Sequence, residues 1–263
     1  MRLEILRHQR LKPLCRVLPL LASFALFGCP AGREVGNDVC LTCHNGLLAP
    51  DQSSFPMSAH HFLDCERCHG PGQAHVRNGG QGGLFIENPN RLPFDEHYEL
   101  CAACHATQLD GYLDSDHARK KAVRCTDCHD VHTPPVTRLS FIDNELCRAC
   151  HEFPSIEAIS EHTFHSYNPT TTGASRCTNC HMPPLVRTDQ PDGPHLHSMQ
   201  PIPPIQSNLA MDAGIFPAPP NSCSGIMGCH DGTVITAPVF DVDDPEDNQL
   251  LQIIFESRYG ETQ

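Results

Sequence analysis

The stretch from Cys40 to His75 reads CLTCHNGLLAPDQSSFPMSAHHFLDCERCHGPGQAH, and it decides how the rest of the chain is organised. It contains the pattern C-x-x-C-H twice, in residues 40–44 and 65–69. A Ser-x-His sequence ending at His60 lies between the two copies, and His75 follows the second. The same arrangement returns further along the chain, so this stretch is a repeat unit.

C-x-x-C-H is the pattern of covalent haem attachment, because two thiols so spaced reach one edge of a porphyrin and the next side chain is placed to bind the iron. Six copies are regular, and a variant copy has five residues between Cys223 and Cys229. The predicted attachment cysteines are Cys40, Cys43, Cys65, Cys68, Cys101, Cys104, Cys125, Cys128, Cys147, Cys150, Cys177, Cys180, Cys223 and Cys229. The predicted proximal iron ligands are His44, His69, His105, His129, His151, His181 and His230.

Zinc binding and disulfide bonding account for these cysteines less well than haem does. Paired C-x-x-C sequences also bind zinc, but zinc does not require a histidine directly after every second cysteine. A disulfide framework would not require that histidine either. The sequence therefore predicts haem c at six sites, and at the variant seventh site as well.

The six regular motifs form three pairs, which we call doublets one, two and three. Their first cysteines are 25, 24 and 30 residues apart within a doublet. The expected organisation is a signal peptide (1–28), a tether (29–39), doublet one (40–75), a Gly-rich loop (76–96), doublet two (97–132), doublet three (133–197), an extended Pro-rich linker (198–221) and the seventh site with a C-terminal helix (222–263).

Seven irons with two axial histidines each would need seven further histidines. The candidates are His60, His75, His97, His117, His132, His162, His165 and His195, with His61 and His197 also available. We expect ligands to pair within a doublet: His60 with His44, His75 with His69, His117 with His105, His132 with His129 or a neighbour, His162 or His165 with His151, and His195 or His197 with His181. His97 could serve any neighbour. Methionine is the rival ligand, but no methionine recurs with the doublets.

The N-terminus has the form of an export signal. Five basic residues precede an apolar run over residues 17–27, which is too short to span a membrane. The run ends in Leu26-Phe27-Gly28-Cys29, which resembles a bacterial lipobox and predicts lipidation at Cys29. The alternative is ordinary secretion with Cys29 as an unpaired thiol.

Charge and composition narrow the fold and the partners. Beyond residue 28, 13 Lys and Arg oppose 30 Asp and Glu, a formal charge of −17, which disfavours nucleic acid as a partner. With seven haems in 235 residues that include 22 Pro and no Trp, haem must supply much of the buried apolar area. The expected fold is therefore mostly coil with short α-helices, little or no β-sheet, and an extended chain of stacked haems. Residues 155–162 and a segment starting at Asp244 are predicted to be helical.

The pattern over residues 40–75, C-x-x-C-H, Ser-x-His, C-x-x-C-H-G-P-G-x-x-H, resembles the doubled-motif multihaem c-type cytochromes. That group includes decahaem electron-conduit cytochromes and the pentahaem donors to nitrite reductase. The resemblance covers residues 40 to 197 and implies covalent haem c, mostly bis-histidine ligation, and a role in anaerobic or extracellular respiration.

The expected function is an electron carrier rather than an enzyme, since two axial histidines leave no open position on the iron. Expected partners are redox proteins or other multihaem cytochromes, with extracellular metal oxides as alternative acceptors and the membrane reached through a lipid anchor. The expected location is the periplasm or cell surface, on the outer membrane of a Gram-negative bacterium. One alternative is a reductase or oxidase of nitrogen compounds, because residues 177–183 resemble the C-x-x-C-H-M-P motif of nitrite reductases; its open haem is expected at the seventh site. Another alternative is the subunit of a cytochrome filament.

Overall fold

The computed structural model describes residues 32–81, 85–107, 109, 111–134, 137–139, 144–153, 155–167, 173–187 and 195–260. The predicted signal peptide, the lipobox and Cys29 lie outside these residues.

Short helices joined by irregular segments make up the described chain. The α-helices are α1 (Asn37–Cys43), α2 (Glu66–His69), α3 (Gln73–Arg77), α4 (Phe94–His105), α5 (Asp116–Arg119), α6 (Cys125–Cys128), α7 (Glu145–Arg148), α8 (Ile156–Thr163), α9 (Cys177–His181), α10 (Ile205–Asp212) and α11 (Pro245–Tyr259). The 3₁₀ helices are η1 (Phe55–Met57), η3 (Pro89–Arg91), η4 (Tyr112–Asp114) and η5 (Gly173–Ser175). Extended pairing among the described residues is limited to two isolated bridges, His129 with Thr137 and Pro184 with His195. The predicted mostly coil, helical fold is confirmed in this coarse sense.

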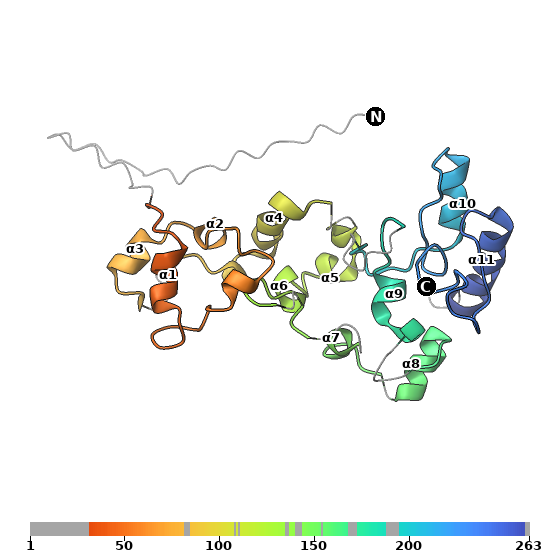
Figure 1. Ribbon diagram of the computed structural model, residues 1–263, viewed down its shortest axis with the longest axis horizontal. Helices are drawn as coiled ribbons and strands as arrows, with labels where there is room; N and C mark the ends of the chain where they lie inside the picture. The colour runs from red at the N-terminus through yellow and green to blue at the C-terminus, as the bar shows by residue number, and fades with distance from the viewer. Residues whose placement is uncertain are drawn as a thin grey trace.

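Successive groups of helices follow one another along the long axis of the molecule (Figure 1). Helices α1 to α3 lie at one end, α4 to α6 in the middle, and α10 and α11 at the other end, with α7 and α8 to one side. Each doublet therefore meets mainly its neighbours in sequence, as expected for a repeat array. None of the helices in the described part of the chain has the length and apolar character needed to cross a membrane.

Two predicted helices are confirmed, and their caps explain where they begin. The Ser155 hydroxyl accepts a hydrogen bond from the Ala158 N–H at 3.2 Å and starts α8. The Asp244 carboxylate accepts from the Glu246 N–H at 2.8 Å and starts α11, with Pro245 in the first turn.

The segment expected to be an extended linker, residues 198–221, is instead partly helical. Helix α10 occupies residues 205–212 and packs on α11. The Gln252 side chain accepts from the Ile205 N–H at 3.0 Å, and the Asn208 side chain donates to the Pro245 carbonyl at 3.0 Å. The proline content suggested an open chain, but the prolines lie before and after the helix and leave its interior free.

The protein core is small. The buried apolar side chains among the described residues are Phe55, Tyr112, Ala118, Ile159, Tyr167, Ala218, Val242 and Leu251. They are spread along the whole chain rather than gathered in one layer. The described residues instead line a long cavity.

Candidate haem-binding cavity

One continuous cavity of about 3600 Å³ runs through the molecule, and all fourteen motif cysteines and all seven motif histidines line it. This volume is about 510 Å³ for each motif, which falls within the ~300–1,000 Å³ of a pocket for one large organic ligand. The cavity is therefore large enough for a series of such ligands and far larger than one would need.

Each regular motif is folded as one helical turn. The N–H of the motif histidine donates to the carbonyl of the first cysteine, at 3.0 Å for His69 to Cys65 and 2.9 Å for His151 to Cys147. A single turn places the two thiols and the imidazole on neighbouring positions of one face. Local sequence alone produces this arrangement, so it recurs wherever the motif does.

The variant seventh motif is held by side chains rather than by a helical turn. The Asn221 carboxamide oxygen accepts from the N–H groups of Cys223 and Ser224, both at 2.9 Å. Its nitrogen bonds to Ser207, Ser224 and Asn248, which are all buried. This network fixes Cys223 to the packed pair α10 and α11, so the longer motif still presents its cysteine to the cavity.

Neighbouring motifs meet through their cysteines, in chain order. Within the doublets, the first thiols lie close together in the pairs Cys40–Cys65, Cys101–Cys125 and Cys147–Cys177. Between successive units, Cys68 lies near Cys104, Cys128 near Cys147 and Cys150, and Cys180 near Cys223 and Cys229. The seven motifs thus form one unbranched series along the cavity.

Burial favours the protonated thiol at several of these cysteines. Burial, together with a neighbouring cysteine, raises the pKa of Cys180 to about 11 and that of Cys223 to about 12. In the described part of the chain, His97, Cys101 and Cys125 have ligand atoms within 4.8 Å of one another. Both cysteines belong to C-x-x-C-H motifs, so this group reflects the contact between the third and fourth motifs.

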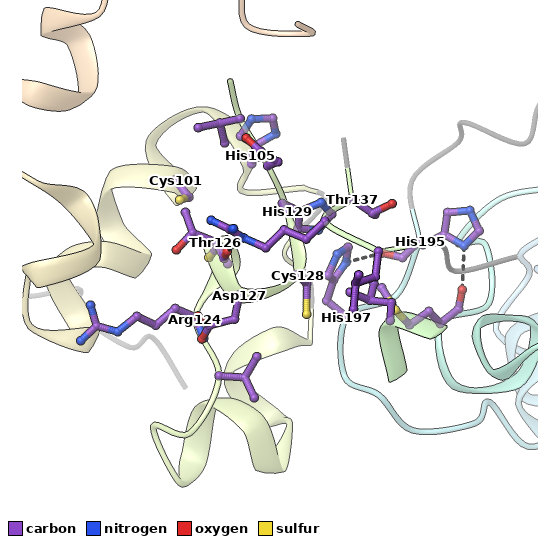
Figure 2. Close-up of a pocket in the computed structure, with 18 of the residues that line it drawn as sticks. Cys101, His105, Arg124, Thr126, Asp127, Cys128, His129, Thr137, His195 and His197 are labelled. Carbon is purple, nitrogen blue, oxygen red and sulfur yellow. Dashed lines mark hydrogen bonds between the residues drawn. The ribbon is translucent and has the colours of Figure 1, made fainter. Parts of the chain in front are cut away.

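Six of the motif histidines face a second imidazole. The ring centres are 6.0 Å apart for His69 and His132, 5.7 Å for His105 and His60, 6.4 Å for His129 and His197, 5.8 Å for His151 and His117, 6.0 Å for His181 and His162, and 6.2 Å for His230 and His165. Figure 2 shows one pair, His129 and His197, brought together from distant parts of the chain.

These separations match a metal shared between two rings. A histidine nitrogen lies about 2 Å from a transition metal and the ring centre about 1 Å further, so two rings on opposite sides of one ion are about 6 Å apart. The residues present therefore fit a haem iron with two axial histidines.

Backbone carbonyls orient several of these imidazoles. The Nδ1 of His69 bonds to the Glu87 carbonyl at 2.8 Å and that of His230 to the Pro238 carbonyl at 2.8 Å. The facing ring of His165 bonds through Nδ1 to the Thr163 carbonyl at 2.6 Å. A carbonyl can only accept, so each Nδ1 carries the proton and each Nε2 keeps a lone pair.

Burial favours the neutral form of four of the facing histidines. The pKa values of His60, His117, His132 and His162 are all lowered, first by burial and then by the imidazole each one faces. A neutral imidazole is the form that binds a metal. The electrostatics of the cavity therefore favour ligation over protonation.

The pairs of facing rings are not the pairs expected from sequence. His60 lies against His105 instead of His44, and His117 against His151 instead of His105. Likewise His132 faces His69, in place of His75, and His197 faces His129 rather than His181. His162 and His165 face His181 and His230, not His151.

A simple rule describes the observed pairs. The Ser-x-His histidines of doublets one and two, His60 and His117, reach forward to the first motif of the next doublet. His132 and His197 are the last residues of doublets two and three. Each faces the second motif histidine of the preceding doublet. The doublets therefore interlock.

The remaining candidates occupy other positions. His195 bonds through Nδ1 to the Met182 carbonyl at 2.6 Å, and His197 bonds to the His195 carbonyl at 2.8 Å (Figure 2). His97 is 1% exposed, with Nδ1 on the Pro89 carbonyl at 2.9 Å and its Nε2 among the cysteines described above. His75 lines the cavity on α3, as His44 does after α1.

Comparison with known proteins gives a distant relation. The chain is 28% identical over 166 residues to "Multiheme cytochrome MtrA" of Shewanella baltica (strain OS185), covering 59% of this chain and 48% of that protein. The chain thus spans about half the length of the curated relative it matches. No family model matches the sequence, and no solved structure matches it. The chain is distantly related to a multihaem cytochrome.

Proposed function

We propose that this protein is an exported c-type cytochrome that carries electrons through a linear series of seven covalently attached haems. The observation that carries the proposal is the set of six facing imidazole pairs across one cavity, 5.7 to 6.4 Å apart between ring centres. Haem, when bound, supplies an iron that gains and loses a single electron. The distant relation to a multihaem cytochrome supports the same function.

The residues of the chain have three tasks in this proposal. The cysteines hold each haem by two thioethers, and the motif histidine takes the proximal position. The facing histidines take the distal positions of six haems, and these are His132, His60, His197, His117, His162 and His165. His75, His97 and His195 also line the cavity and are the candidates that remain for the haem at His44. With both axial positions filled by fixed side chains, substrate has no access to the iron and little rearrangement accompanies a change of charge.

The contacts between the thiols support a path in chain order. Cysteines of successive motifs meet from Cys40 at one end to Cys229 at the other, so each haem would lie next to the haems of the neighbouring motifs. An electron entering at either end would leave at the other, and the two ends are the places where redox partners would dock. Redox proteins, other multihaem cytochromes and extracellular metal oxides are the proposed donors and acceptors.

The structure disfavours the alternative enzyme at the seventh site. The rings of His165 and His230 face each other with centres 6.2 Å apart, which supports a closed seventh site rather than the open haem expected for an enzyme. For location, we propose export by the signal of residues 1–28 and a lipid anchor on Cys29 at the outer membrane, facing the periplasm or the cell surface. This part rests on the sequence pattern.

The number of haems tests the proposal. The holoprotein is produced in a host that attaches haem c, and its intact mass and its pyridine haemochrome absorbance are measured. Seven covalent haems are expected, with six in a Cys223→Ala/Cys229→Ala variant and seven in the matched Cys29→Ala variant, which loses only the lipid. Fewer than six haems in the unaltered protein, or bound zinc in their place, would refute the proposal.

A further inference from the structure

Two asparagines occupy the same place in doublets one and three. Asn37 and Asn144 each lie three residues before the first cysteine of their doublet, Cys40 and Cys147. Neither belongs to a C-x-x-C-H motif. In the structure, each side chain leaves its own motif and bonds to the other motif of the doublet.

The two sets of bonds are the same. The Asn144 nitrogen donates to the Ser175 carbonyl at 2.9 Å, and its oxygen accepts from the Cys177 N–H at 2.8 Å. The Asn37 nitrogen donates to the Leu63 carbonyl at 3.1 Å, and its oxygen accepts from the Cys65 N–H at 2.7 Å. In both doublets the partners are the first cysteine of the second motif and the residue two positions before it. We call this pair of bonds the asparagine bridge.

Doublet two holds the corresponding carbonyl by another means. Tyr98 stands where the asparagine stands in the other doublets, and its ring stacks on Tyr112 with centres 5.9 Å apart and 10° between the planes. The Tyr112 hydroxyl donates to the Val123 carbonyl at 2.5 Å, and Val123 lies two residues before Cys125. The same backbone group is thus fixed in all three doublets.

The asparagine bridge acts where the two motifs of a doublet meet. The thiols of Cys40 and Cys65 lie close together, as do those of Cys147 and Cys177. A carboxamide is planar, so bonds from both its nitrogen and its oxygen fix the direction as well as the distance of the partner backbone. Asn144 is fully buried, and water therefore does not compete for its bonds.

We infer that Asn37 and Asn144 are positioning residues that set the spacing and relative orientation of the two haems within a doublet, and that Tyr112 does so in doublet two. The inference rests on the proposed function, since it requires haem on the bridged cysteines. It goes beyond that function by assigning the geometry of each haem pair to a side chain outside the C-x-x-C-H motifs.

Circular dichroism in the Soret region tests the inference, because closely spaced haems give a two-signed signal whose size depends on their distance and angle. The holoproteins compared are the unaltered chain, Asn144→Ala, Asn37→Ala and Tyr112→Phe. Asn45→Ala is the matched control, since Asn45 is exposed, lies outside the C-x-x-C-H motifs and donates to the Thr42 carbonyl of its own helical turn at 3.0 Å rather than to the second motif of the doublet. We expect the bridge variants to keep seven haems and lose part of the two-signed signal, while the control keeps all of it.

Two results would overturn the inference: an unchanged signal in Asn144→Ala and Tyr112→Phe, or an equal loss in Asn45→Ala. Should Asn144→Ala fail to accumulate, Tyr112→Phe still removes a single oxygen, and Asn37→Ala acts at a half-buried position. Absence of covalent haem from the unaltered chain would refute the proposed function, whereas seven haems with unchanged bridge variants would refute the positioning role alone.

Discussion

The carboxylate of Glu66 joins the segment before α1 to doublet one, and its removal has a calculable effect. Glu66 is 6% exposed, and its two oxygens accept from the N–H groups of Val35, Gly36 and Gly72 at 2.7 to 2.9 Å. Hydrogen bonds to a charged group contribute about 1.5–3 kcal/mol each. Glu66→Gln retains one oxygen and turns an NH₂ towards backbone donors, so we expect the opening of residues 33–36 to become about 2 kcal/mol easier.

Hydrogen exchange measures this opening directly. A loss of about 2 kcal/mol corresponds to an increase of roughly 30-fold in the exchange rate of the Val35 and Gly36 amides, followed by mass spectrometry of peptides from this segment. Glu34→Gln is the matched control, because Glu34 is exposed and one residue from Val35. Equal exchange in Glu66→Gln and the unaltered protein, or an equal increase in Glu34→Gln, would refute the reasoning.

The same contact predicts a dependence on pH. Burial opposes ionisation of Glu66, but the three backbone donors outweigh it and lower its pKa below the ordinary 4.5. Because the pKa is lower in the folded protein, the stabilising contribution is complete above 4.5 and is lost as the pH falls through the lowered pKa. Protection of Val35 and Gly36, corrected for intrinsic exchange, should therefore decline in acid in the unaltered protein and change much less in Glu66→Gln.

Two further substitutions test the distal histidines and a helix cap. His165→Ala should leave the haem at His230 with an open position, which would appear as a high-spin paramagnetic resonance signal that cyanide shifts. The control is His61→Ala, which removes an exposed ring bonded to the Ser58 carbonyl and should leave the spectrum unchanged. A seventh haem that stays low-spin in His165→Ala would contradict the assignment. Ser155→Ala removes the N-cap of α8 and should destabilise that helix by about 1 kcal/mol. Amide hydrogen exchange over residues 156–163 should become faster, and unchanged exchange would show that the cap contributes nothing.

The local features of the fold follow from sequence because they depend on neighbouring residues. Two helix starts could be predicted from capping residues. Ser155 precedes the helix over residues 156–163, and Asp244-Pro245 begins the last helix. The C-x-x-C-H turn is equally local. Helix α10 could not be predicted in the same way. The hydrogen bonds that hold it are made with α11, which lies some forty residues further along the chain.

The partners of the histidines could not be read from sequence for a physical reason. A spacing along the chain says which residues can lie close together, and it favours ligands from the same doublet. The path of the backbone instead carries His60 to the next doublet and His197 back to the preceding one. Only the three-dimensional path distinguishes these choices.

One signal in the sequence could have revealed the asparagine bridge. Asn37 and Asn144 stand at the same offset from Cys40 and Cys147, a repetition as regular as that of the Ser-x-His histidines. This repetition does not by itself indicate a function, since an asparagine before a helix is a common N-cap. Its role emerges only when the second motif of the doublet is seen to receive both bonds.

Electron paramagnetic resonance of the oxidised holoprotein at low temperature, with and without cyanide or nitrite, tests the central claim most directly. If every iron lies between two imidazoles, only low-spin signals appear and neither ligand moves them. A high-spin signal that shifts when ligand is added would show an open iron in the unaltered protein. It would contradict the account of this chain as a closed series of electron-carrying haems.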